Sequence, residues 1–141
     1  MTGQPLDTPG EVRELVASLA GGDRSAAFAL HALLSEADDQ GYAPVNRVAI
    51  RFRDDFLESL RARGLDATKE AGRLSLDEVR EFLAGSVFPR LTVQEAIEYP
   101  VTIPGDAEPG LRVVPALWGR VAAIRREVAE GFRLTGATAA V

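Results

Sequence analysis

The chain has no cysteine and a single histidine, His31. Without thiols it cannot form a disulfide scaffold, a zinc–thiolate site, an iron–sulfur cluster or a cysteine nucleophile. One histidine also excludes metal sites built from several imidazoles, and a Ser-His-Asp triad would depend on the placement of this one residue. We therefore expect a protein that is not an enzyme and has no catalytic residue, metal or cofactor.

Lysine is almost absent, because Lys69 is the only lysine among 16 basic residues and the others are arginine. There are 21 acidic residues, so the formal net charge at pH 7 is −5. This balance argues against tight nonspecific binding to phosphate backbones. The arginine excess is typical of a bacterial-like, GC-rich genome, although arginine is also favoured at bidentate and interface contacts.

The 141 residues are the length of one domain. The hydrophobic share of 46% and the charged share of 26% are those of a soluble globular protein. No apolar run approaches the roughly 18 residues of a membrane span, and residues 1–10 lack the apolar core of a signal peptide. We predict a cytoplasmic chain without a membrane partner. Residues 8–133 form its single globular domain, between a flexible tail at 1–7 and a frayed tail at 134–141.

Capping signals and apolar spacing predict about five helices. A capping box begins the first at Thr8, and Asp23 caps a second helix so rich in apolar residues that we place it at the centre of the fold. A third helix extends from Arg51 to Arg63. Another capping box begins at Ser75, and Pro115 permits the start of the last helix.

The segments between these helices carry weaker signals. Gly85 predicts the end of the fourth helix, and Pro89 predicts an extended or turning backbone at Phe88. The capping box Thr92–Glu95 then predicts one short helix. The pattern of Val45–Ile50 fits a helical turn or a strand equally well.

Two β-branched runs, Val101–Ile103 and Leu111–Val114, flank the loop Pro104–Gly110. Apolar runs on both sides of a Pro/Gly/Asp connection predict a β-hairpin. The predicted fold class is mainly α (α+β), a compact helical domain with one β-hairpin near its C-terminal third.

Two carboxylate pairs and the histidine are the residues that acid–base chemistry would use. Asp54 and Asp55 fall on the predicted outer face of their helix, and Asp77 and Glu78 occupy a first turn, where negative charge stabilises the helix. His31 lies among apolar residues in the most buried helix. We interpret all five as structural.

A row of arginines lies on and just before the helix Arg51–Arg63. Arginine on a helix often contacts phosphates, which makes the row the candidate nucleic-acid site. The interleaved Asp54, Asp55 and Glu58 offer ion pairs at i,i+3 and i,i+4 spacing, so we favour a solvated, internally paired face. The members of the row are Arg47, Arg51, Arg53, Arg61 and Arg63.

The last helix has the least balanced positive charge, together with the only tryptophan. Trp118 at the start of this helix is favoured as a core residue, with an interface anchor as the alternative. We predict that a protein partner binds here. The candidate partner-binding residues are Trp118, Arg120, Arg125 and Arg126.

The predicted order over residues 23–114 is helix, helical turn, helix, helix and hairpin. The apolar positions along it are Leu33-Leu34, Gly41-Tyr42, Val48-Ala49-Ile50, and Phe52 to Leu65 with Arg63-Gly64-Leu65 at its end. This pattern resembles winged-helix domains, in which three helices precede a two-stranded wing. The resemblance implies nucleic-acid contacts on the helix Arg51–Arg63 and on the loop Gly105–Gly110. One difference is the helix at Ser75, which separates the third helix of the pattern from the wing.

The candidate wing loop carries Asp106 and Glu108 and no basic residue, which argues against a wing that grips DNA. Many winged-helix modules bind proteins instead. We therefore expect a non-enzymatic accessory or protein-interaction subunit of a larger cytoplasmic assembly. The alternative is a winged-helix-like nucleic-acid-binding regulator, or a small subunit of a nucleoprotein complex. A homo-oligomer is also compatible with the sequence.

Overall fold

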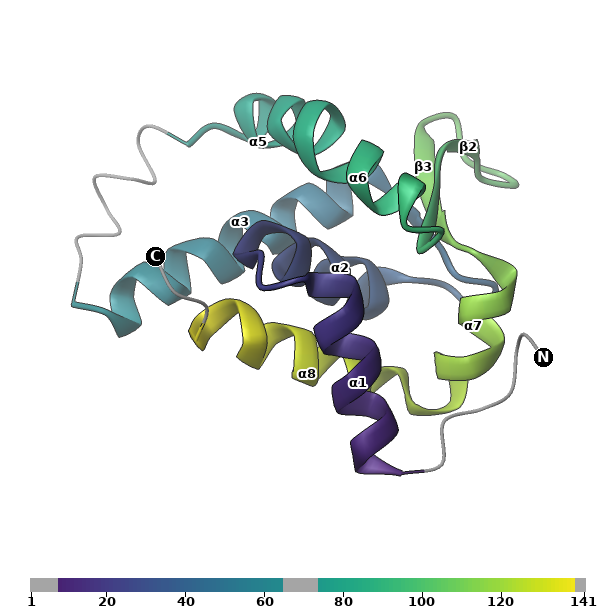
Figure 1. The fold of residues 1–141 in the computed structure, drawn as a ribbon. Coiled ribbons are helices and arrows are strands. Elements are labelled where there is room, and N and C mark those ends of the chain that lie inside the picture. Colours follow the sequence, from purple (N-terminus) through teal and green to yellow (C-terminus); the bar gives the residue numbers. More distant parts are fainter. Residues whose placement is uncertain (1–7, 65–73, 139–141) are drawn as a thin grey trace.

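Helices dominate the fold, and three short strands form a small sheet at one side (Figure 1). The computed structural model describes residues 8–64 and 74–138. The helices are α1 (Pro9–Ala20), α2 (Arg24–Glu36), α3 (Val45–Ala62), α5 (Leu76–Phe82), α6 (Phe88–Val93), α7 (Pro115–Val121) and α8 (Arg125–Thr138), and the strands are β1 (Tyr42–Pro44), β2 (Ile97–Thr102) and β3 (Pro109–Val113). The predicted mainly α (α+β) class is confirmed. No helix in the two described ranges combines the length and apolar character that a membrane span requires.

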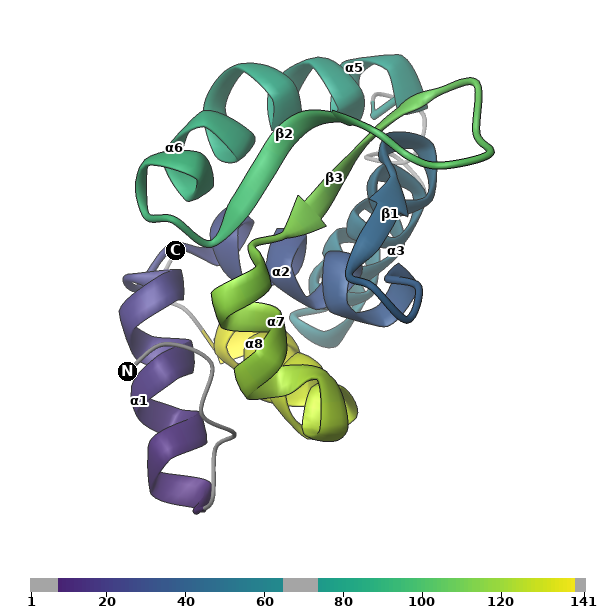
Figure 2. The same ribbon diagram turned by 90° about the vertical axis from the view of Figure 1, so that its right-hand side faces the viewer.

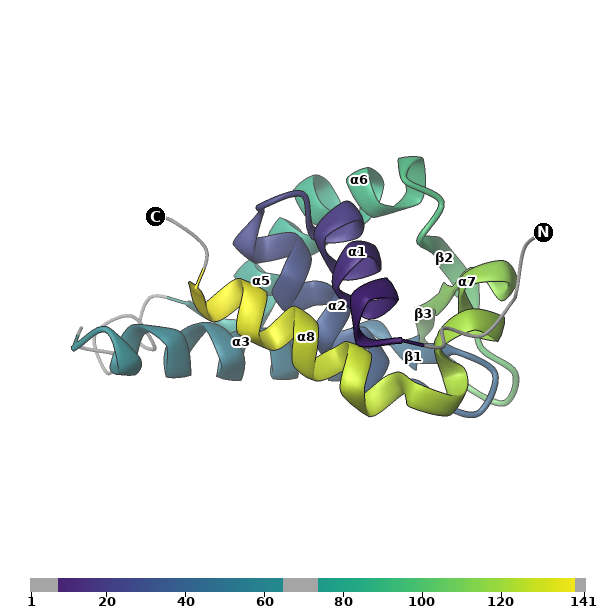
Figure 3. The ribbon, with the colours of Figure 1, turned by 60° about the horizontal axis from the view of Figure 1, so that its bottom comes forward.

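Helix α2 forms the centre of the core, as its composition predicts. The Asp23 side chain caps it by accepting a hydrogen bond from the backbone N–H of Ser25 at 2.8 Å. Every residue of Ala26–Leu34 is buried. Helices α1, α3 and α8 all pack against α2 (Figure 3). A helix that is apolar on all sides is stable only when it is covered from all sides.

The sheet has the antiparallel order β1-β3-β2, with β3 in the middle (Figure 2). The predicted hairpin is therefore confirmed as β2 and β3. Strand β1 was not predicted, because its three residues are too few to show a periodic pattern. It exists through its pairing with β3, in which Ala43 lies opposite Leu111 and Pro44 opposite Gly110.

Helix α3 is continuous from Val45, so the ambiguous stretch Val45–Ile50 is its beginning. The short second helix and the separate third helix of the winged-helix pattern are therefore one helix. Gly64 has φ +76°, the left-handed conformation expected after a helix end. A glycine in this position also predicts an apolar contact from the next residue, Leu65, which lies outside the described residues.

The prediction that the fourth helix ends at Gly85 is wrong. A π-helical turn, Leu83–Val87, connects α5 directly to α6, so residues 76–93 form one continuous helical segment. The turn precedes Pro89, whose missing N–H would interrupt a regular α-helical ladder. Phe88 and Pro89 are therefore helical and not extended. The short helix predicted from Thr92 is also wrong, because α6 ends at Val93 and β2 begins at Ile97.

The C-terminal helical stretch has the predicted apolar stripe, but a 3-10 turn, Ala122–Ile124, divides it into α7 and α8. Helix α8 continues to Thr138, beyond the point where fraying was predicted. Gly136 explains why the helix continues. It is buried against the ring of Phe28, and because it has no side chain the last turn of α8 can pack closely on α2. The predicted tail at 1–7 and residues 139–141 lie outside the described residues.

Gly136→Ala tests this contact. Alanine stabilises a helix relative to glycine by roughly 0.5–1 kcal/mol, but a Cβ at position 136 would lie 2.7 Å from the buried ring of Phe28. We expect overpacking to lower the free energy of unfolding by about 1–3 kcal/mol, measured by urea denaturation. Gly85→Ala is the control, since a Cβ there meets no atom within 4 Å and should preserve or raise stability. Equal effects at both positions would contradict the packing of the last turn.

Candidate functional site

The Trp118 side chain makes contacts within the chain. Its indole Nε1–H donates a hydrogen bond to the backbone oxygen of Asp39 at 3.0 Å. Its ring lies against Gly41, where a Cβ would stand 3.2 Å from Trp118 Cδ2 and where φ is +89°. Trp118 therefore holds the turn between α2 and β1. This contact supports the core interpretation over that of an interface anchor.

Arg125 acts on the same turn. Its Nη1 donates to the backbone oxygen of Ala37 at 2.7 Å, and its guanidinium lies 6.0 Å from the centre of the Trp118 ring. The donor satisfies a carbonyl just beyond the C-terminus of α2, where helices leave such groups unpaired. Of the four candidate partner residues, Arg126 is exposed and Arg120 half-buried. Neither has an ion-pair partner in the described ranges.

The arginine row on α3 is mostly paired within the chain. The contacts are Arg51 with Glu36 at 2.9 Å, Arg61 with Glu58 at 3.3 Å, and Arg53 Nε with the backbone oxygen of Leu74 at 2.7 Å. Arg63 also interacts within the chain. Arg47 is exposed, and no described residue forms an ion pair with it. Of the three interleaved acids, Glu58 alone has a described ion pair with a member of the row.

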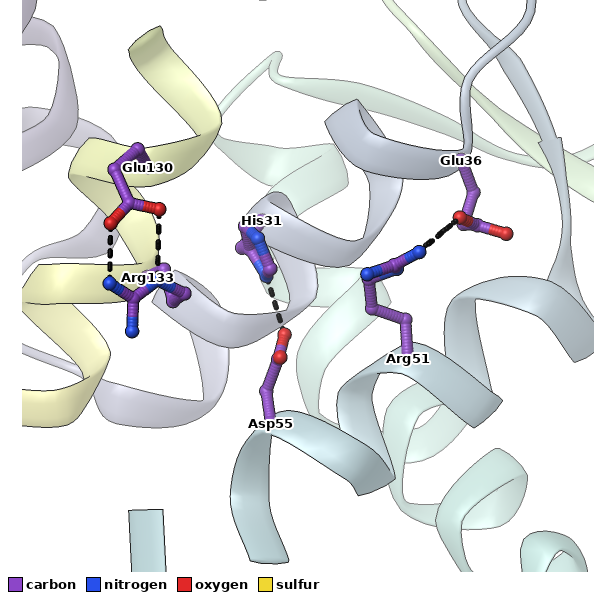
Figure 4. A network of polar contacts seen from close by, with 6 residues as sticks. All are labelled: His31, Glu36, Arg51, Asp55, Glu130 and Arg133. Atoms are coloured by element: carbon purple, nitrogen blue, oxygen red, sulfur yellow. Dashed lines mark hydrogen bonds and ion pairs between the residues drawn. The ribbon is translucent and has the colours of Figure 1, made fainter. Parts of the chain in front are cut away.

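Asp55 points into the fold, and its predicted outward placement is wrong. Its Oδ2 lies 2.5 Å from Nδ1 of His31 on α2, and the two side chains are 15% and 10% exposed (Figure 4). Asp55 belongs to the face of α3 that covers α2, at helical spacing from the buried Val48, Phe52 and Ser59. The sequence shows this spacing. It also shows an apolar stripe of Phe52, Phe56 and Leu60, which indicates a different buried face for the helix and led to the outward placement of Asp55.

Helix α8 adds two charges near this pair (Figure 4). Arg133 Nε donates to Glu130 Oε2 at 2.9 Å. The hydrogen bond from Arg133 lowers the pKa of Glu130, and His31 contributes in the same direction. The Glu130 hydrogen bond raises the pKa of Arg133, and Asp55 adds to this shift. Charges from α2, α3 and α8 thus influence one another across the core helix.

A histidine oriented by an aspartate resembles the base of a hydrolytic triad, which also needs a hydroxyl within hydrogen-bond reach. Ser59 lies one helical turn after Asp55 on α3. Its hydroxyl is buried and has no hydrogen-bond partner among the described residues. In the described part of the chain, no three ligand-type side chains gather as a metal site would require. The observed contact of His31 and Asp55 connects two helices.

A second polar network lies beside the hairpin loop and was missed by sequence reasoning. Asn46 Nδ2 donates to Glu108 Oε2 at 2.8 Å, and Arg80 Nη1 donates to Asn46 Oδ1 at 2.5 Å. Arg80 also pairs with Asp77. These contacts join the loop to α3 and α5, although the residues are far apart in the sequence. They also engage Arg80, the one basic residue of α5.

Comparison of the chain with protein-family models, curated proteins and solved structures finds no match.

Asp55→Ala tests the connection between α2 and α3. Loss of the carboxylate leaves the buried imidazole without its partner, so we expect the free energy of unfolding to fall by about 1–3 kcal/mol. The adjacent and exposed Asp54 provides the control, because Asp54→Ala should change stability by less than about 0.5 kcal/mol. Urea denaturation of both variants measures the difference. Similar losses at 54 and 55 would count against a specific role for Asp55.

Arg133→Gln tests the α8 pair through pH. Because Arg133 lowers the pKa of Glu130 in the folded state, the pair stabilises the fold above the ordinary pKa of glutamate. That stabilisation is lost as pH falls through the lowered pKa. We expect the variant to be slightly less stable than the natural chain at neutral pH, with the gap closing in acid. A gap that stays constant across thermal denaturation series from neutral pH to pH 3 would contradict this coupling.

Proposed function

We propose that this chain is a protein-interaction module that acts as a non-enzymatic accessory subunit of a larger assembly. The observation that carries the proposal is the chemistry of the segment before the hairpin and of the hairpin loop. The outward residues of α5 include Glu78 and Glu81, and the loop carries Asp106 and Glu108. Carboxylates on these two elements would repel phosphates and favour a protein surface.

We also propose that the chain is winged-helix-like, which is compatible with the same function. Because residues 45–62 form one helix, α2, α3 and the α5–α6 segment follow one another in the described part of the chain and precede the hairpin. The α5–α6 segment, which was expected to separate the third helix from the wing, would then take the place of the third helix in the winged-helix pattern. The resemblance would then place nucleic-acid contacts on α5–α6 and on the loop, where the acidic residues lie.

Arg47 favours the second candidate function, binding to nucleic acid. It is exposed, and no described residue forms an ion pair with it. Its neighbours in the row are mostly engaged by acids or carbonyl groups of the chain. A single unpaired arginine contributes little to an affinity that depends on several simultaneous phosphate contacts.

Two parallel measurements on the full chain test the proposal. In the first, the tagged chain captures material from its native lysate with and without nuclease, and each captured protein is purified and recombined with the chain. We expect a complex of fixed stoichiometry that survives nuclease. In the second, fluorescence anisotropy with duplex DNA and single-stranded RNA should show no binding tighter than about 10⁻⁴ M at physiological salt.

Arg47→Glu provides the matched variant for the second measurement. If the chain binds nucleic acid, this charge reversal should weaken binding and reduce its salt dependence. Salt-dependent binding that Arg47→Glu abolishes, together with loss of all captured material on nuclease treatment, would replace the first function with the second. The complex with protein should be indifferent to Arg47→Glu.

A further inference from the structure

The helical segment 76–93 has an outward face that is largely exposed, although the centre of the Phe82 ring lies 6.2 Å from that of Phe52 on α3. Figure 1 shows α5 and α6 along the upper edge of the molecule. The inward residues Val79, Leu83 and Val87 are buried. The outward residues that share the opposite side over successive turns are Phe82, Gly85, Ser86, Pro89 and Val93, and all are exposed.

Between Glu81 and Glu95 this face carries no exposed charged residue and is partly apolar. Phe82 is 44% exposed and Val93 is 83% exposed. Single exposed apolar residues are common on protein surfaces, but here two of them stand at the ends of one helical face with no charged residue among the five. Helical faces that dock into partners have anchors at such spacing.

Gly85 lies in the middle of this face. Glycine in a helix interior is destabilising relative to alanine. A Cβ at position 85 would meet no atom within 4 Å, so no contact inside the described chain requires a glycine there. A glycine does permit the backbone of a second helix to approach closely. Its position therefore fits a contact made with another molecule.

The charges that flank the face indicate the partner's chemistry. Glu78 and Glu81 lie at one end and Glu95 lies beyond the other, and none forms an ion pair with a described residue. The two arginines of the segment are engaged inside the chain, Arg80 with Asp77 and Asn46, and Arg90 with Asp23. The face is thus an uncharged stripe with uncompensated negative charge at both ends.

A second copy of the chain fits this face poorly. In a two-fold contact the helices would pack antiparallel, with Glu78 and Glu81 of one copy towards Glu95 of the other, or parallel, with the glutamates of each end beside their own counterparts. Like charges at both ends would oppose association, as does the net charge of −5.

We propose that the outer face of α5–α6 is the docking surface for an amphipathic helix of a partner protein, whose apolar stripe is flanked by lysine or arginine. The inference rests on the proposed protein-interaction function and names the surface and the class of partner segment. The apolar stripe covers Phe82 and Val93, and the partner backbone crosses at Gly85. The basic flanks meet the three unpaired glutamates.

Site-specific photo-crosslinking in the native cells tests the surface. A photoreactive residue replaces Ser86 or Val93 in the full chain, and in a control it replaces Ser18, which is exposed on α1. We expect the first two positions, and not the third, to crosslink one protein through a segment with an apolar stripe between basic residues. Crosslinks to nucleic acid, to a second copy or to an acidic segment would overturn the proposal, as would equal yield at Ser18 or no crosslink.

A synthetic peptide of the crosslinked segment then measures the contribution of each feature. Gly85→Leu should leave the fold unchanged, because the position is open, and should raise the Kd at least about tenfold by blocking close approach. Glu78→Lys with Glu81→Lys should raise the Kd similarly, whereas Glu14→Lys on α1 should not. Unchanged affinity in both test variants would refute the assignment.

The outcome for this surface is separable from that of the proposed function. If a stoichiometric protein complex forms but crosslinks only from a photoreactive residue at Arg126, the chain is an interaction module that uses α8, and the α5–α6 assignment fails alone. If no protein complex survives nuclease treatment, the proposed function fails with it.

Discussion

The burial of α2 on every side is the constraint on which the rest of the structure depends. Nine consecutive residues, Ala26–Leu34, are buried. The surrounding helices therefore have to supply apolar cover together with a partner for the one polar side chain, His31. Asp55 meets that need from α3, and Gly136 lets the last turn of α8 close over Phe28. Both residues act through contacts with α2.

Two arginines and the only tryptophan make contacts at or just beyond the C-terminal end of α2. Arg51 pairs with Glu36, Arg125 donates to the oxygen of Ala37, and Trp118 donates to that of Asp39. Helix C-termini leave carbonyl groups without internal partners and carry partial negative charge, so nearby cations and donors stabilise them. These three residues are candidates for a binding surface in the sequence, but in the structure they form hydrogen bonds or ion pairs within the chain.

The distribution of the remaining groups supports recognition of protein over phosphate. Most described arginines of α3 and of the α5–α6 segment have acids or carbonyl oxygens of the same chain as partners. The glutamates at the ends of the outer α5–α6 face have none among the described residues. The outer α5–α6 face is therefore uncharged in its middle and negative at its ends, which is the reverse of what a nucleic-acid groove requires.

The sequence by itself determined the elements whose signals are local. The caps at Thr8, Asp23 and Ser75 and the β-branched hairpin are all found where they were predicted, because each depends on residues a few positions apart. Only the tertiary structure decided the existence of β1, the continuity of helix through Gly85 and the inward turn of Asp55. These depend on pairing with β3, on burial of Leu83 and Val87, and on a histidine 24 residues away. Local sequence patterns do not fix such contacts, because their energy arises only when distant segments meet.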